Sequence, residues 1–98
     1  MKIATTATYR GQPVDVVIDV RTKLEFWLGH LDHAICIPVD TIALELPKRA
    51  EVGKGARILL YCASGARSQA AAAQLTLLGY KNVIDGGGMS AAAAKYSP

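Results

Sequence analysis

Short apolar runs recur along the chain, separated by segments of mixed polarity. Residues 14–20 form a nearly continuous run rich in β-branched side chains, which is typical of a strand covered on both faces. Shorter runs at residues 34–37, 57–61 and 82–85 predict three more strands. Residues 1–8 mix β-branched residues with alanine and predict a short edge strand before a glycine- and proline-containing turn.

The segments between these runs have the spacing and end signals of helices. Thr22 can cap a short helix that stops at Gly29, and Asp40 or Thr41 can cap a helix that ends before Pro47. An alanine-rich segment at 69–78 predicts the longest helix, and residues 90–95 predict a short last one. Strands alternating with helices predict an α/β fold with a mainly parallel central sheet of four to five strands flanked by helices, as one domain over residues 1–98.

Composition and charge narrow the possible functions. The net charge is +3 without a dense basic and aromatic cluster, so we expect neither a nucleic-acid partner nor a membrane partner. Two cysteines are too few for a disulfide framework, and their spacing matches no zinc motif, so we expect no metal and no cofactor. The first residues lack an apolar signal region, which predicts a cytoplasmic protein, or a periplasmic one if a signal peptide has been removed.

The most informative stretch is the loop Cys62-Ala63-Ser64-Gly65-Ala66-Arg67-Ser68, which lies between a predicted buried strand and a predicted helix. In such a turn backbone N–H groups can point inward, and the helix N-terminus adds partial positive charge. An anion is stabilised there, so the pKa of Cys62 should be depressed and its thiolate nucleophilic. The sequence therefore predicts an active site at Cys62. Ser64 and Ser68 can donate to the sulfur, although Ser68 is equally suited to cap the helix.

Several polar residues outside the loop have structural and functional interpretations. Asp19 and Arg21 end an apolar strand, where a buried carboxylate must be paired or hydrogen-bonded. We favour a structural role, in which the two residues brace neighbouring loops. The alternative is that Arg21 lines the substrate entrance. His30 is expected to close a hydrogen bond between loops, and His33 to be a partly exposed loop residue. We interpret Cys36 as a small core residue. Phe26 and Trp27 are expected in the core or in a pocket wall.

Four segments together resemble the rhodanese family of sulfurtransferases, particularly single-domain members of the phage-shock type. They are Asp19-Val20-Arg21; Glu25-Phe26 with Gly29-His30-Leu31, Ala34 and Ile37-Pro38; Cys62 to Ser68; and Leu78-Gly79-Tyr80 with the glycines Gly86 to Gly88. The resemblance implies an enzyme that moves sulfane sulfur from thiosulfate or a similar small anionic donor, through a persulfide on Cys62, to cyanide or a thiol acceptor. It also implies that Arg67 holds the sulfonate oxygens of the donor, while the loop residues Ala63 to Ser68 bind the sulfur.

Alternatives from other classes remain. The domain can be a non-catalytic or persulfide-carrier interaction domain, although the presence of Cys62 favours catalysis. Phosphatases of the Cdc25 type and related arsenate reductases resemble this fold but use a loop one residue longer, which a tetrahedral phosphate requires. This chain also departs from the rhodanese pattern at His33, where relatives usually have glycine, and at Met89, where an aromatic residue commonly follows the glycine turn.

Overall fold

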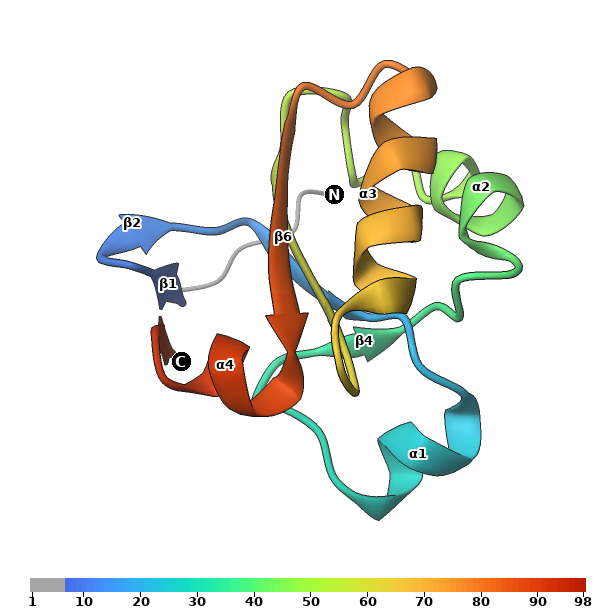
Figure 1. Ribbon diagram of the computed structural model, residues 1–98. Coiled ribbons are helices and arrows are strands. Elements are labelled where there is room, and N and C mark those ends of the chain that lie inside the picture. The colour runs from blue at the N-terminus through green and yellow to red at the C-terminus, as the bar shows by residue number, and fades with distance from the viewer. Residues whose placement is uncertain (1–6) are drawn as a thin grey trace.

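A four-stranded parallel sheet forms the centre of the computed structural model, which describes residues 7–98 (Figure 1). Its strand order is β4 (Ile35–Cys36), β3 (Val16–Asp19), β5 (Arg57–Cys62) and β6 (Asn82–Gly88). All three neighbouring pairs run parallel. The α/β fold with a mainly parallel sheet that the sequence predicted is therefore confirmed.

Side chains alternate between the two faces of the sheet and build a hydrophobic cluster on each. On one face, Ile18 and Leu60 pack with the helices α2 (Ile42–Glu45) and α3 (Ala66–Leu77). On the other face, Val17 and Leu59 pack with Ala92 of α4 (Met89–Ala93) and with the N-terminal part of the described chain. Burial on both faces explains why the central strands are nearly continuous apolar runs.

A second, smaller sheet lies beside the central one. It is antiparallel, with β1 (Thr8–Tyr9) between β2 (Gln12–Pro13) and β7 (Tyr96–Ser97). Of the edge strand predicted over residues 1–8, only Thr8 falls in β1, and positions 1–6 lie outside the described residues. The remaining short elements are α1 (Lys23–Leu28) and a 3-10 turn η1 (Leu46–Lys48).

Several element boundaries differ from the prediction at the edge of the sheet that matters most. Strand β5 includes Cys62, and α3 begins at Ala66 rather than at residue 69, so only three residues separate them. Strand β6 continues through the glycines to Gly88, which the sequence analysis assigned to a turn. Helix α4 begins one residue earlier than predicted. None of the helices over residues 7–98 is long and apolar enough to cross a membrane.

Candidate active site

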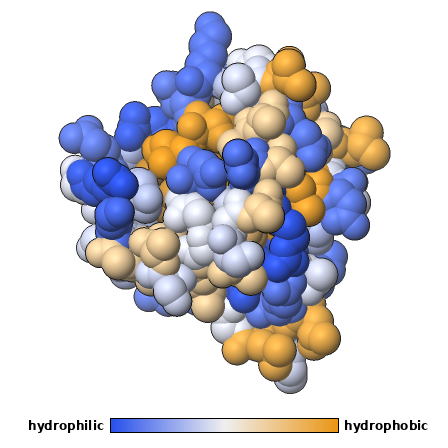
Figure 2. Space-filling model, viewed as in Figure 1, coloured by the Kyte–Doolittle hydropathy of each residue, from blue (hydrophilic) through white to orange (hydrophobic). Residues whose placement is uncertain are grey.

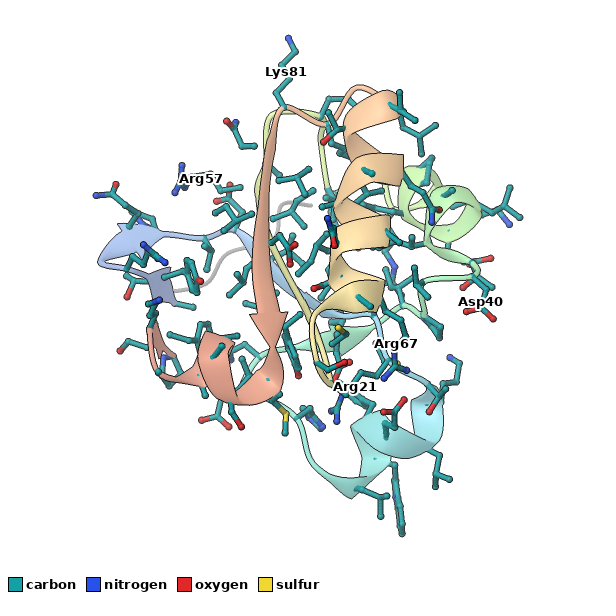
Figure 3. The ribbon with its side chains drawn as sticks, viewed as in Figure 1. Arg21, Asp40, Arg57, Arg67 and Lys81 are labelled. Atoms are coloured by element: carbon teal, nitrogen blue, oxygen red, sulfur yellow. The ribbon has the colours of Figure 1, made fainter. Side chains whose placement is uncertain are left out.

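The cysteine loop lies at the carboxyl edge of the parallel sheet, the usual position of ligand sites in such folds. Cys62 is the last residue of β5, a strand placed between β3 and β6. Arg21 and Arg67 lie at this same end of the molecule, near α1, whereas Lys81 lies at the opposite end (Figure 3). The topology therefore brings the residues predicted from separate segments to one edge.

Glycine backbone conformation shapes the loop. Gly65 has a φ of 110°, which other residues rarely adopt, and it turns the chain from the strand into α3. In this conformation its N–H donates to Cys62 Sγ at 2.9 Å. Gly88 of β6 supports the loop from the side, because a Cβ there would lie 2.6 Å from the Ala63 carbonyl oxygen. The loop therefore rests directly on the backbone of the neighbouring strand.

The environment of Cys62 favours the thiolate. Burial alone would raise the pKa of this thiol, but hydrogen bonds from the backbone and side chain of Ser68 and from the N–H groups of Gly65 and Ser64 outweigh burial and lower the pKa. The direction agrees with the prediction from the sequence. Cys36 differs, because burial raises the pKa of its thiol. Of the two cysteines, Cys62 is thus the one whose surroundings favour the thiolate.

Ser68 is buried beneath the loop and faces several acceptors. Its hydroxyl lies 2.7 Å from Asp85 Oδ1 and 3.0 Å from the Gly65 carbonyl oxygen. The alternative that Ser68 caps the helix is wrong, because the N-cap of α3 is Gly65 and Ser68 lies in the first turn. Asp85 also accepts the N–H of Gly87, so its carboxylate connects the loop to β6.

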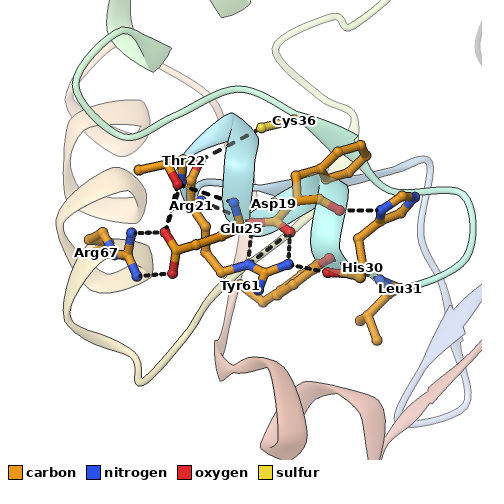
Figure 4. Close-up of polar contacts among 11 residues, drawn as sticks. Asp19, Arg21, Thr22, Glu25, His30, Leu31, Cys36, Tyr61 and Arg67 are labelled. Atoms are coloured by element: carbon orange, nitrogen blue, oxygen red, sulfur yellow. Dashed lines mark hydrogen bonds and ion pairs between the residues drawn. The ribbon is translucent and has the colours of Figure 1, made fainter.

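Arg67 forms a bidentate ion pair with Glu25 of α1 (Figure 4). Its Nη1 donates to Glu25 Oε1 at 2.7 Å and its Nη2 to Oε2 at 3.0 Å. Glu25 also belongs to a capping box, in which Oε1 accepts from the N–H of Thr22. The sequence analysis did not assign Glu25 to the site. The Thr-x-x-Glu spacing signals the cap, but it does not reveal a partner 42 residues away.

This ion pair predicts a specific dependence of stability on pH. The hydrogen bonds from Arg67 and then from Thr22 lower the pKa of Glu25 from 4.5 to about 2. A carboxyl whose pKa falls on folding stabilises the protein above its unfolded pKa and loses that effect as pH falls towards the folded value. The free energy of unfolding of the wild type should therefore exceed that of Glu25→Gln by a constant amount above about pH 5.5. This difference should shrink as the pH falls below about 4.5 and should be mostly lost near pH 2. Urea titrations at several pH values measure this; a difference that persists at about pH 2 would contradict the assignment.

Asp19 and Arg21 form a buried ion pair at the end of β3. Asp19 accepts from the backbone N–H of Arg21 at 2.9 Å and from the guanidinium at 2.7–3.0 Å. Arg21 Nη2 also donates to the Gly29 carbonyl oxygen at 2.6 Å, at the C-terminal end of α1. This arrangement supports the bracing role that the sequence favoured, since the pair ties β3 to the loop after α1.

Other predicted residues lie near α1 but have different surroundings from those expected. His30 stacks on Phe26 with ring centroids 3.6 Å apart, and its Nδ1 lies 2.8 Å from the Phe26 carbonyl oxygen, so it closes the end of the helix rather than joining two loops. Placing Trp27 in the core or a pocket wall was wrong, because it is 77% exposed. His33 is exposed, with a positive φ of 70°. Cys36 is half-buried in the short strand β4, at the edge of the sheet.

Comparisons with known proteins identify the family and the fold of the chain. A family profile described as the rhodanese-like domain matches residues 6–95. The tRNA uridine(34) hydroxylase of Erwinia tasmaniensis is 35% identical over 92 residues, which cover 89% of this chain but 26% of that protein. The chain thus spans about a quarter of the length of the curated relatives it matches.

Solved structures extend the comparison to the fold. A structure described as a rhodanese with anions from E. coli superposes with a TM-score of 0.74 at 27% identity, covering 84% of this chain and 95% of that one. The human single-domain sulfurtransferase TSTD1 superposes with a TM-score of 0.62 at 24% identity, covering 74% of this chain and 75% of that one. The likeness to the human protein is one of fold.

Proposed function

Because this chain belongs to the rhodanese-like domain family, we propose that it is a sulfurtransferase that carries sulfane sulfur as a persulfide on Cys62. The observation that carries the proposal is the thiol itself. Cys62 ends a buried strand, accepts the Gly65 N–H at 2.9 Å and has a lowered pKa. The proposed donor is thiosulfate or a similar small anion, and the proposed acceptor is cyanide or a thiol.

The reaction has two displacement steps at sulfur. The Cys62 thiolate attacks the outer sulfur of thiosulfate, a new S–S bond forms, and the S–S bond of thiosulfate breaks so that sulfite leaves with the electron pair. Cyanide or a thiolate then attacks the outer sulfur of the persulfide, and the Cys62 thiolate leaves. The Gly65 N–H, already directed at Sγ, stabilises negative charge on sulfur before and after each step. Because Cys62 is buried, a transferred group as small as one sulfur atom is favoured.

Arg67 is the proposed partner of the donor's sulfonate group. Its planar guanidinium stands at the first turn of α3, directly after the loop. Arg67→Ala should raise the KM for thiosulfate and lower kcat/KM about tenfold or more, since charged hydrogen bonds contribute about 1.5–3 kcal/mol. Arg67→Lys should restore little, because an ammonium lacks the bidentate fork. Steady-state kinetics with thiosulfate measure both; unchanged kinetics in the alanine variant would exclude this role.

One assay tests the proposed function. The protein should form thiocyanate from thiosulfate and cyanide, and incubation with thiosulfate alone should add the mass of one sulfur atom. It should not hydrolyse aryl phosphates, because the loop from Cys62 to Arg67 has one residue fewer than the phosphatase loops it resembles. A stable sulfur adduct without turnover would favour the persulfide-carrier alternative. Phosphatase activity without thiocyanate would overturn the proposal.

A second candidate comes from the curated relatives, which are tRNA uridine(34) hydroxylases. The observation in its favour is 35% identity over 89% of this chain. In this alternative the domain serves a uridine-modifying reaction rather than sulfur transfer. Purified protein and tRNA lacking the modification, analysed by mass spectrometry for hydroxylated uridine 34, would distinguish the two. Hydroxylation without thiocyanate formation would favour the second candidate.

A further inference from the structure

The arginine that we expect to receive the donor is already bonded to a carboxylate of the protein. We propose that Glu25 determines the charge selectivity of the site: it competes with anionic donors for Arg67, so that the site favours alkyl persulfides, which lack a sulfonate, over thiosulfate. This inference rests on the proposed sulfurtransferase function and makes Glu25 a specificity-determining residue.

The geometry of the pair makes Glu25 a direct competitor. Two oxygens of its carboxylate lie 2.7 and 3.0 Å from the two terminal nitrogens of Arg67 (Figure 4). Two oxygens of a sulfonate would need the same two nitrogens for bidentate binding. Thiosulfate must therefore displace Glu25 or accept poorer contacts with Arg67.

Glu25 is held in place before any donor arrives. Its Oε1 lies 3.1 Å from both the backbone nitrogen and Oγ1 of Thr22, and its own N–H donates to that hydroxyl at 3.2 Å. The carboxyl stays ionised at neutral pH, since its pKa is lowered to about 2. The competing charge is therefore both fixed in position and present under all ordinary assay conditions.

The neighbouring arginine does not provide an alternative anion site. Arg21 donates to Asp19 at 2.7 Å and to the Gly29 carbonyl oxygen at 2.6 Å, and it is largely buried. Each of the two arginines at this edge is thus balanced by one carboxylate. A thiosulfate dianion gains little net attraction from such a balanced pair of charges. An alkyl persulfide needs no such attraction: Cys62 attacks its outer sulfur, the S–S bond breaks, and the alkyl thiolate leaves.

Helix α1 allows the exchange of partners to be observed. None of its residues is buried, and Leu24, Trp27 and Leu28 are 66–77% exposed. Figure 2 shows hydrophobic surface gathered over this helix. The polar contacts of Glu25 anchor the N-terminal end of α1. Displacement of Glu25 from Arg67 by an anion should therefore change the surroundings of this helix. Trp27 is the only tryptophan in the sequence, and its fluorescence can report that change.

The test is Glu25→Gln, compared with Glu45→Gln. Glutamine is isosteric and can keep the capping box, but it carries no charge to hold Arg67. The KM for thiosulfate should fall about tenfold in Glu25→Gln, as expected when a charged hydrogen-bond competitor is removed. The KM for an alkyl persulfide such as 2-hydroxyethyl persulfide, which has no sulfonate to bind Arg67, should stay within about twofold. Glu45→Gln removes a carboxylate from the exposed pair with Lys48 on α2 and η1, and should leave both values unchanged.

Two further measurements separate selectivity from a structural role. In an Arg67→Ala background, Glu25→Gln should no longer change the KM for thiosulfate, because the group competed for is absent. Sulfate, used as an inert anion and followed by Trp27 fluorescence, should bind Glu25→Gln about tenfold more tightly than wild type. This readout needs no turnover, so it tests the inference even if the proposed function fails. An unchanged or raised thiosulfate KM, together with unchanged sulfate binding, would overturn the inference.

Discussion

Cys62→Ser should abolish both the sulfur adduct and the formation of thiocyanate. A serine hydroxyl at this position would stay protonated at neutral pH, and an alcohol cannot replace a thiolate as a nucleophile towards sulfur. The hydrogen bonds of the loop lower the pKa of Cys62 and so prepare a thiolate at this one position. We expect the turnover rate to fall by more than about a thousandfold, the scale seen when a catalytic nucleophile is removed.

The matched control for this variant is Cys36→Ser. Cys36 is half-buried in β4, its Sγ lies 3.6 Å from the Arg21 carbonyl oxygen, and burial raises the pKa of its thiol. Serine should therefore replace it with little change in adduct mass or in turnover. Intact-mass spectrometry after incubation with thiosulfate, combined with a thiocyanate assay, measures both quantities. An inactive Cys36→Ser with a fully active Cys62→Ser would reverse the assignment.

The second large effect should be on stability, at Asp19. This carboxylate is fully buried and accepts three bonds from the Arg21 guanidinium as well as its backbone N–H. Asp19→Asn would leave the Arg21 cation buried without its counter-ion, which costs about 3–5 kcal/mol. A domain has a total stability of only about 5–15 kcal/mol, so the variant should be close to unfolding.

Urea denaturation followed by circular dichroism measures this loss. Glu45→Gln removes one partner of an exposed ion pair with Lys48 and should cost less than about 1 kcal/mol. Replacing both members, with Asp19→Asn and Arg21→Met together, should recover part of the loss, because no buried charge then remains unpaired. If Asp19→Asn were as stable as Glu45→Gln, the buried pair would not be the brace described above.

Local sequence patterns were sufficient to predict the central sheet. Buried parallel strands have sequences that are runs of β-branched and aliphatic residues, and residues 14–20 are a clear example. The position of Cys62 at a strand end followed from the polar loop and the alanine-rich helix beyond it. Asp19 was expected to have a partner and to brace neighbouring loops with Arg21, because a carboxylate at the end of a buried strand must be paired or hydrogen-bonded. Each of these inferences depends on residues close together in the chain.

The features that sequence reasoning missed depend on contacts between distant segments. Glu25 meets Arg67 only because α1 folds back onto the first turn of α3, 42 residues away. The two-residue strand β7 exists only as a partner of β1, and so short a segment has no periodicity of its own. The exposure of Trp27 was missed for a different reason: the prediction relied on the general tendency of large aromatic residues to be at least partly buried, and Trp27 does not follow it.

The small antiparallel sheet has a consequence for how such a domain can be placed within a larger protein. Thr8 pairs with Ser97 and Tyr9 with Tyr96, so the first and last described strands are direct neighbours running in opposite directions (Figure 1). The chain therefore enters and leaves the domain at nearly the same point. A host protein could accept the domain at a surface turn without moving the two flanking residues apart, as is typical of domains tolerated as insertions. Both connections to the host would then leave from the small sheet, and the central sheet would keep its own strand pairing.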